Sequence, residues 1–118
     1  MKTDEAILAF SESEKIKGGL IWVSQAVELL QGLHGAENKG GATVLTAMIH
    51  MVAQESRLAQ QMTGGKDWDG VDEHLERAVN MVNAGVGHEA TIHLTRALSL
   101  VTNVGLHAMT ALKDRNLL

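Results

Sequence analysis

The sequence predicts an all-α protein: an antiparallel up-down four-helix bundle that forms a single domain over residues 1–118. The chain contains no proline, and its many Ala, Leu, Met, Glu and Gln residues lose little side-chain freedom in a helix. Glycines interrupt the sequence roughly every 20 to 24 residues, and between them the apolar residues follow the helical period. The short connections at 64–66 and 85–87 favour antiparallel neighbours, which an up-down bundle provides.

The first helix has a clear apolar stripe but an uncertain course. The stripe consists of Ile16, Leu20, Val23, Val27 and Leu30. Because glycine lowers helix propensity, this helix can bend at Gly18-Gly19 or divide there. In the second case a short segment over 4–17 precedes a longer helix that ends near Leu33.

The other three helices are predicted over residues 43–62, 67–84 and 88–113. The second should bury Val44, Leu45, Met48, Met51, Val52, Leu58, Ala59 and Met62. The third should begin at Asp67, which can cap free amide groups, and should bury Trp68, Val71, Leu75, Ala78, Val79 and Val82. The fourth tolerates Gly105 and should bury Ala90, Leu94, Ala97, Leu98, Val101, Ala108 and Leu112.

Composition excludes several classes of function. Without cysteine the chain has no disulfide, thiolate metal site or catalytic thiol. The formal charge of −4 and the presence of only two Trp, one Phe and no Tyr argue against nucleic acid as a partner. The longest apolar run, residues 6–10, is too short to span a bilayer, so we expect a cytoplasmic protein without a membrane anchor.

Glu55 breaks the apolar pattern of the second helix. At about 100° per residue it projects into the middle of the apolar face, where a carboxylate needs water or a partner. Counting outward from the turns places His74 at the same level, Ser99 or Leu100 beside it, and Gly19 on the first helix. We therefore expect a small ligand-binding pocket at Glu55, His74 and Gly19, with a solvated Glu55 as the alternative.

The sequence contains no catalytic constellation and no motif that assigns it to a family. The histidine and glutamate spacings do not match a metal-binding bundle, so neither a metal nor a cofactor is expected. The first helix, however, carries more apolar surface than one bundle needs, at Ile21, Trp22 and Leu29. These residues predict a homodimer interface, unless rotation of the helix turns Trp22 into the monomer core. The favoured interpretation is a non-enzymatic, self-associating interaction or adaptor module. The alternative is a small-ligand or metal-binding bundle built around Glu55.

Overall fold

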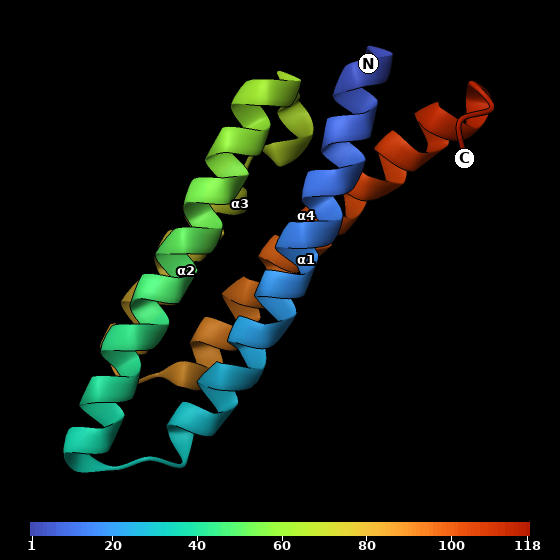
Figure 1. Ribbon diagram of the computed structural model, residues 1–118. Helices are drawn as coiled ribbons and strands as arrows, with labels where there is room; N and C mark the ends of the chain where they lie inside the picture. Colours follow the sequence, from blue (N-terminus) through green and yellow to red (C-terminus); the bar gives the residue numbers. More distant parts are fainter.

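The computed structural model describes residues 1–118 as four helices without a strand (Figure 1). The helices are α1 (Thr3–Gln31), α2 (Gly35–Thr63), α3 (Val71–Asn83) and α4 (Gly87–Asp114), and a short 3-10 turn, η1 (Lys66–Trp68), precedes α3. Each helix packs against its neighbour in the chain, and α1 closes the ring by packing against α4. The predicted all-α, up-down four-helix bundle is therefore confirmed. It forms a rod of 54 × 21 × 18 Å, and none of its helices combines the length and hydropathy needed to cross a bilayer.

The most extensive packing joins α1 to α4 along nearly their whole lengths. The buried residues of α1 recur at alternating spacings of three and four: Ala6, Ala9, Ser13, Ile16, Leu20, Val23, Val27 and Leu30. The buried residues of α4 follow a similar rhythm: Ala90, Leu94, Ala97, Val101, Val104, Gly105, Ala108 and Leu112. This spacing keeps one stripe of each helix facing its partner, as in coiled coils.

The first half of α1 and the second half of α4 approach each other closely, with small residues at their contact. Ser13 and Gly105 are both buried there, and a Cβ atom built at Gly105 would lie 2.7 Å from the Ser13 Oγ atom. The Ser13 hydroxyl donates a hydrogen bond to the Phe10 carbonyl within α1. Arg115 donates hydrogen bonds to the Met1 carbonyl and the Thr3 hydroxyl, which tie the end of α4 to the start of α1.

The first helix does not break at Gly18-Gly19, because α1 is continuous from Thr3 to Gln31. Each glycine costs about 1 kcal/mol of helix propensity, and the long packing contact with α4 offsets that cost. Gly19 serves the contact with α2 instead, since a Cβ atom there would lie 3.3 Å from the Val52 Cγ2 atom.

The second helix begins eight residues earlier than predicted, at Gly35 instead of residue 43. The turn before it uses the positive φ of Gly35 (+60°), and Gly40-Gly41, expected to interrupt the chain, lie inside the helix. Gly41 has a packing role, because a Cβ atom there would lie 2.8 Å from the Leu30 Cδ1 atom of α1. Gly41 therefore marks a close contact between helices and not a turn.

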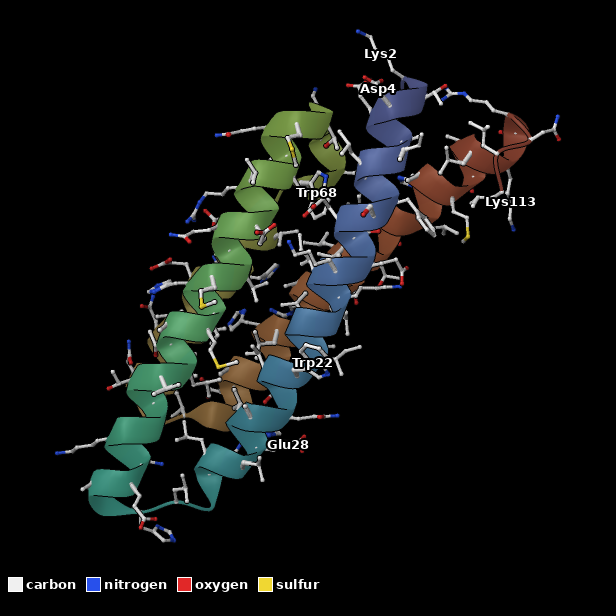
Figure 2. The ribbon with its side chains drawn as sticks, in the orientation of Figure 1. Lys2, Asp4, Trp22, Glu28, Trp68 and Lys113 are labelled. Carbon is white, nitrogen blue, oxygen red and sulfur yellow. The ribbon has the colours of Figure 1, made fainter.

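The third helix begins at Val71 and not at the predicted Asp67. Gly70 has a φ of +90°, a left-handed conformation that separates η1 from α3. Asp67 lies in η1, where its Oδ2 atom is 3.0 Å from the Nδ1 atom of His107 on α4. The predicted burial of Trp68 is confirmed at 2% exposure (Figure 2), and α4 begins and ends within one residue of the prediction.

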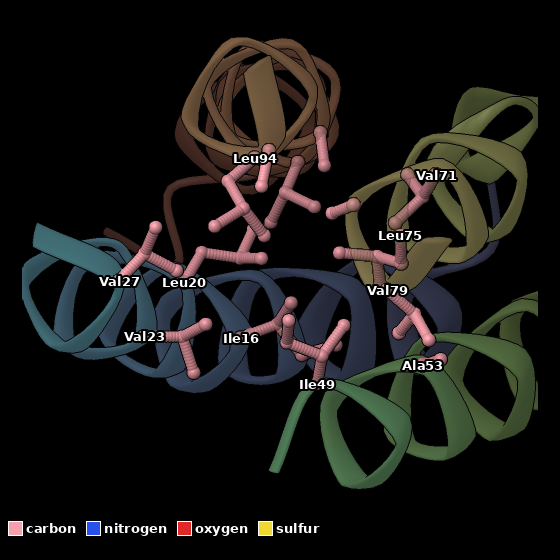
Figure 3. Packing of buried hydrophobic residues seen from close by; sticks show 14 of the residues in the cluster. Ile16, Leu20, Val23, Val27, Ile49, Ala53, Val71, Leu75, Val79 and Leu94 are labelled. Carbon is pink, nitrogen blue, oxygen red and sulfur yellow. The ribbon is translucent and has the colours of Figure 1, made fainter. Parts of the chain in front are cut away.

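The core forms where all four helices converge (Figure 3). Ile16 and Leu20 of α1, Leu75 of α3 and Leu94 of α4 supply large side chains. The inner side of α2 supplies mainly small ones, and its buried residues are Leu45, Ile49, Ala53, Ser56, Ala59 and Thr63. The hydroxyls of Ser56 and Thr63 donate to backbone carbonyls of α2 itself, so both side chains are buried without an unmet hydrogen bond.

The contact between Ser13 and Gly105 leads to a test of the α1–α4 packing. Gly105→Ala should lower the free energy of unfolding by about 1–3 kcal/mol, because its Cβ atom collides with the Ser13 Oγ atom. Removing that atom as well, in Ser13→Ala/Gly105→Ala, should recover most of the loss. Gly18→Ala is the control: nothing lies within 4 Å of its Cβ position, so it should stabilise the helix. Urea denaturation measures all three variants, and a Gly105→Ala protein as stable as the wild type would contradict the close packing.

Candidate functional site: the outer face of α1 and α2

The second helix is rotated so that its larger apolar side chains point outward. Val44, Met48, Met51, Leu58 and Met62 were all predicted to be buried, and this prediction is wrong, since each is exposed. Val44 and Met51 expose 62% and 63% of their surface. The five positions, with Glu55 among them, recur at alternating spacings of four and three residues, so they form one straight stripe along the helix.

The first helix presents a matching stripe beside the one on α2. Trp22 and Leu29 expose 71% and 75% of their surface, which excludes the alternative in which Trp22 enters the monomer core (Figure 2). Ile21 is also exposed, at 44%. We call the two stripes together the α1–α2 face; it comprises Trp22, Ala26, Leu29, Leu33, Val44, Met48, Met51, Leu58 and Met62.

Two hollows run along the groove between the stripes. The first, of about 400 Å³, lies near the connection between the two helices and is lined by Ala26, Leu29, Leu30, Leu33, Gly40, Gly41, Val44, Leu45 and Met48. The second, of about 230 Å³, is lined by Lys15, Ile16, Gly19, Trp22, Met51, Val52 and Glu55. The α1–α2 face therefore contains two separate hollows, of which the first is almost wholly apolar and the second includes Lys15 and Glu55.

The second hollow is lined by Glu55, the residue singled out by the sequence. Its side chain is 37% exposed, and its Oε2 atom lies 3.3 Å from the Lys15 Nζ atom of α1. Glu55 is thus ion-paired and partly solvated. Gly19 lines the same hollow, as expected, so the structure brings two of the three predicted pocket residues together.

A second carboxylate, Glu12, lies beside this ion pair. Loss of hydration through burial raises the pKa of Glu12, the positive charge of Lys15 lowers it, and the negative charge of Glu55 raises it again, with a net upward shift. The Glu12 Oε2 atom is buried and has no hydrogen-bond partner. The sequence offered no sign of this, because Glu12 precedes Lys15 by three residues and resembles an ordinary exposed helix pair.

His74, the third predicted pocket residue, lies on another side of the bundle. Two contacts between α2 and α3 set their register, Arg57 to Asp72 at 2.6 Å and Thr46 to Asn83 at 3.2 Å, and Gln60 pairs with Asp69, just before α3, at 2.7 Å. In this register residue 74 is level with Glu55, as the sequence predicts.

The His74 ring, however, meets α4 and not α1. Its Nδ1 atom lies 3.3 Å from the Nδ1 atom of His93, and the two partly buried rings are stacked with centroids 5.6 Å apart. The neighbour of His74 on α4 is thus His93 and not the predicted Ser99 or Leu100. Loss of hydration lowers the pKa of His93, and the charges of His74, Arg96 and Arg77 lower it further.

The sequence does contain a signal for this histidine pair. The pattern His-Leu-x-Arg-Ala occurs at residues 74–78 on α3 and again at 93–97 on α4. The repeated pattern is only five residues long, which is too short to be recognised as an internal repeat of the chain. Because α3 and α4 are antiparallel neighbours, the repeated pattern lets equivalent histidines meet.

A third hollow lies outside the α1–α2 face. It measures about 420 Å³ at the end of the bundle where the α1–α2 and α3–α4 connections meet, and it is lined by Leu30, Gln31, Asn38, Val82, Gly85, Val86, Gly87, His88 and Glu89. The Asn38 amide already donates to the carbonyls of Leu30 and Leu33, which it caps.

No group of three or more His, Cys, Asp or Glu residues converges on a metal position. No family model, curated protein or solved structure matches the chain. The α1–α2 face remains as the most extensive feature that the core does not use.

The raised pKa of Glu12 predicts a pH-dependent cost to stability. A carboxyl group whose pKa is higher in the folded than in the unfolded chain stabilises the fold while protonated, and this contribution is lost as pH rises through the raised pKa. Glu12→Gln should therefore raise the melting temperature at pH 7, by less than about 5 °C. The difference from wild type should shrink as the pH falls into the range in which carboxylates protonate.

Glu28→Gln is the matched control, since Glu28 is an exposed glutamate on the same helix. Thermal melts of the three proteins between acidic and neutral pH make the comparison. A Glu12→Gln protein that melts below the wild type at pH 7 would show that the ionised carboxylate is favourable there.

Proposed function

We propose that the protein is a non-enzymatic interaction module that forms a homodimer through the α1–α2 face. One observation carries the proposal: over its second half α2 directs Ala53, Ser56 and Ala59 into the core, while the larger side chains of Met51, Leu58 and Met62 line the outside. A monomer would be expected to bury the large side chains and expose the small ones, because burial of apolar surface is the main stabilising term. The exposed position of the large side chains is explained if another protein surface covers this side of α2.

The spacing of the α1–α2 face favours a helical partner. Side chains that recur at alternating intervals of three and four residues form a seam into which the side chains of another helix pack. The face is too large to be scattered exposure, since contiguous apolar patches on monomers seldom exceed a few hundred Å². A second copy of this chain supplies a seam of the same length and period, and a two-fold symmetric contact needs only one such surface.

The charges on the α1–α2 face also suit a second copy. Lys15 on α1 and Glu55 on α2 lie at the same level along the rod, so the α1–α2 face carries a positive and a negative charge at that level. A two-fold axis along the rod would set α1 against α2 of the partner subunit at the same level. Lys15 would then approach Glu55 of the partner subunit, and apolar side chains would meet above and below this point.

The size of the face is compatible with a stable dimer. From Gly41 to Met62, α2 runs about 32 Å, and from Trp22 to Leu33, α1 runs about 17 Å; each helix is about 10 Å wide. The resulting area of about 500 Å² in projection from each partner gives a total of about 1,000 Å², the lower limit expected of a specific interface. The charged residues at its centre are few, as is typical of interface cores.

A small-ligand or metal site around Glu55 is the alternative, and the geometry supports it less. The hollow beside Glu55 measures about 230 Å³, below the roughly 300–1,000 Å³ of most small-molecule sites. Its carboxylate already pairs with Lys15, and His74 lies against α4. Lys15 and Glu55 are the charged groups that line this hollow, and each already has the other as its partner.

Truncation of Trp22 tests the homodimer. Trp22→Ala should weaken self-association by at least about 2 kcal/mol, or roughly thirtyfold in the dissociation constant, because a large side chain is lost from the centre of the interface. Helicity should be kept, since Trp22 contributes little to the monomer core. Sedimentation equilibrium and circular dichroism measure the two effects.

Leu106→Ala is the matched control, because Leu106 is an exposed apolar residue on α4, outside the α1–α2 face. It should leave the dissociation constant unchanged. A wild-type protein that stays monomeric at high micromolar concentration would overturn the proposal, as would a dimer that Trp22→Ala leaves intact.

A further inference from the structure

Glu12 continues the α1 stripe of the α1–α2 face toward the start of the chain. Positions 12, 15, 19, 22, 26, 29 and 33 recur at alternating spacings of three and four residues, so Glu12 lies on the same side of α1 as Trp22. Its Oε2 atom is buried and has no hydrogen-bond partner, although carboxylate oxygens normally accept hydrogen bonds from water or protein. An unpartnered oxygen of this kind is costly while the carboxyl group is ionised.

Glu12, Lys15 and Glu55 form a cluster with two acidic groups and one basic group. The Lys15 Nζ atom lies 3.3 Å from the Glu55 Oε2 atom, so the one positive charge already has a partner. The charges that act on Glu12 come from Lys15 on α1 and Glu55 on α2, whereas α4, the other helix packed against α1, contributes none. When both carboxyl groups are ionised, the cluster therefore has one negative charge in excess.

A homodimer through the α1–α2 face would bring two copies of this cluster together, and the inference that follows rests on that proposed function. With the two-fold axis along the rod, the two clusters meet at the same level. Their excess negative charges would then face each other where water is removed, which opposes association. One proton on each Glu12 would cancel both charges and leave every Glu55 carboxylate with a Lys15 ammonium group.

We propose that Glu12 is protonated on both chains of the homodimer, so that association takes up protons from the solvent and becomes tighter as the pH falls. Each Glu12 carboxylate binds one proton, which gives about two protons per dimer. The protonated carboxyl group is also a donor, and Glu55 lies within reach of its hydrogen bond. Protonation thus removes a charge and supplies a hydrogen bond in the same step.

The direction of the pH effect follows from the surroundings of Glu12. In the single chain, loss of hydration and the neighbouring Glu55 raise the pKa of Glu12 and outweigh the opposing effect of Lys15. Dimerisation removes more water and adds the carboxylates of the second copy, and both changes raise this pKa further. The proton-linked part of the affinity is therefore fully present below the pKa in the single chain. It is lost as the pH rises through the higher pKa in the dimer.

Sedimentation equilibrium of the full chain at several pH values tests the proposal. The dissociation constant of the wild type should fall about tenfold between about pH 7.5 and 5.5. Glu12→Gln cannot ionise, so its dimer should be tighter than the wild type at pH 7.5 and nearly independent of pH. Glu28→Gln is the matched control, because it removes the same charge from an exposed position of α1 and should keep the pH dependence of the wild type. Circular dichroism checks that each variant folds.

Dilution calorimetry in two buffers of different ionisation enthalpy gives a second readout, since it counts the protons released when the dimer dissociates. The wild type should release about two protons per dimer near neutral pH, and Glu12→Gln close to none. A dimer whose dissociation constant does not change with pH would overturn the inference and leave the homodimer standing. The same holds if Glu12→Gln keeps the wild-type pH dependence. A chain that stays monomeric at every pH would overturn both.

Discussion

The rotation of α1 about its own axis is the constraint on which the other features depend. The buried stripe of α1, from Ala6 to Leu30, faces the core and packs against α4. Trp22 lies about 100° around the helix from Val23, so it must fall on the flank once Val23 is buried. The flank then meets α2, and Gly19 and Gly41 allow the close approach of α1 to α2. The α1 side of the α1–α2 face follows from this rotation, and the rotation of α2 supplies the other side.

Helices with a single apolar stripe could be predicted from the sequence, and α2 could not. α3 and α4 alternate apolar and charged sides, and their core residues were identified except on α4, where Val104 and Gly105 are also buried and Leu98 is only partly buried. α2 has two apolar stripes side by side, and the one with larger side chains is the natural choice for the core. The stripe that is buried includes Ser56 and Thr63, which are polar and therefore suggest an exposed position. Both can be buried because their hydroxyls donate hydrogen bonds to backbone carbonyls of α2. Glycine was a second source of error, because sequence alone does not separate a turn glycine such as Gly35 from a packing glycine such as Gly41.

In the candidate sites, too, the position of a residue on its own helix could be predicted, whereas its contacts with other helices could not. Glu55 was correctly placed among Met51, Leu58 and their neighbours, because positions on one helix follow from its period. Its partner Lys15 was not foreseen, since the choice of facing residues depends on the rotation of two helices at once. The level of His74 was correct for a related reason: short turns fix how far each residue lies along the rod, but not the side to which it points.

The exposed methionines on the outer side of α2 are susceptible to oxidation. Met48, Met51 and Met62 all expose at least 40% of their surface, whereas Met81 and Met109 are largely shielded by the bundle. Oxidation of an exposed methionine to the sulfoxide replaces a flexible apolar group with a polar one. Mild oxidants would therefore convert the stripe on α2 from apolar to polar while the core, which contains no sulfur, kept its composition. The surface chemistry of this protein is thus coupled to the redox state of its surroundings through methionine, although the chain has no cysteine.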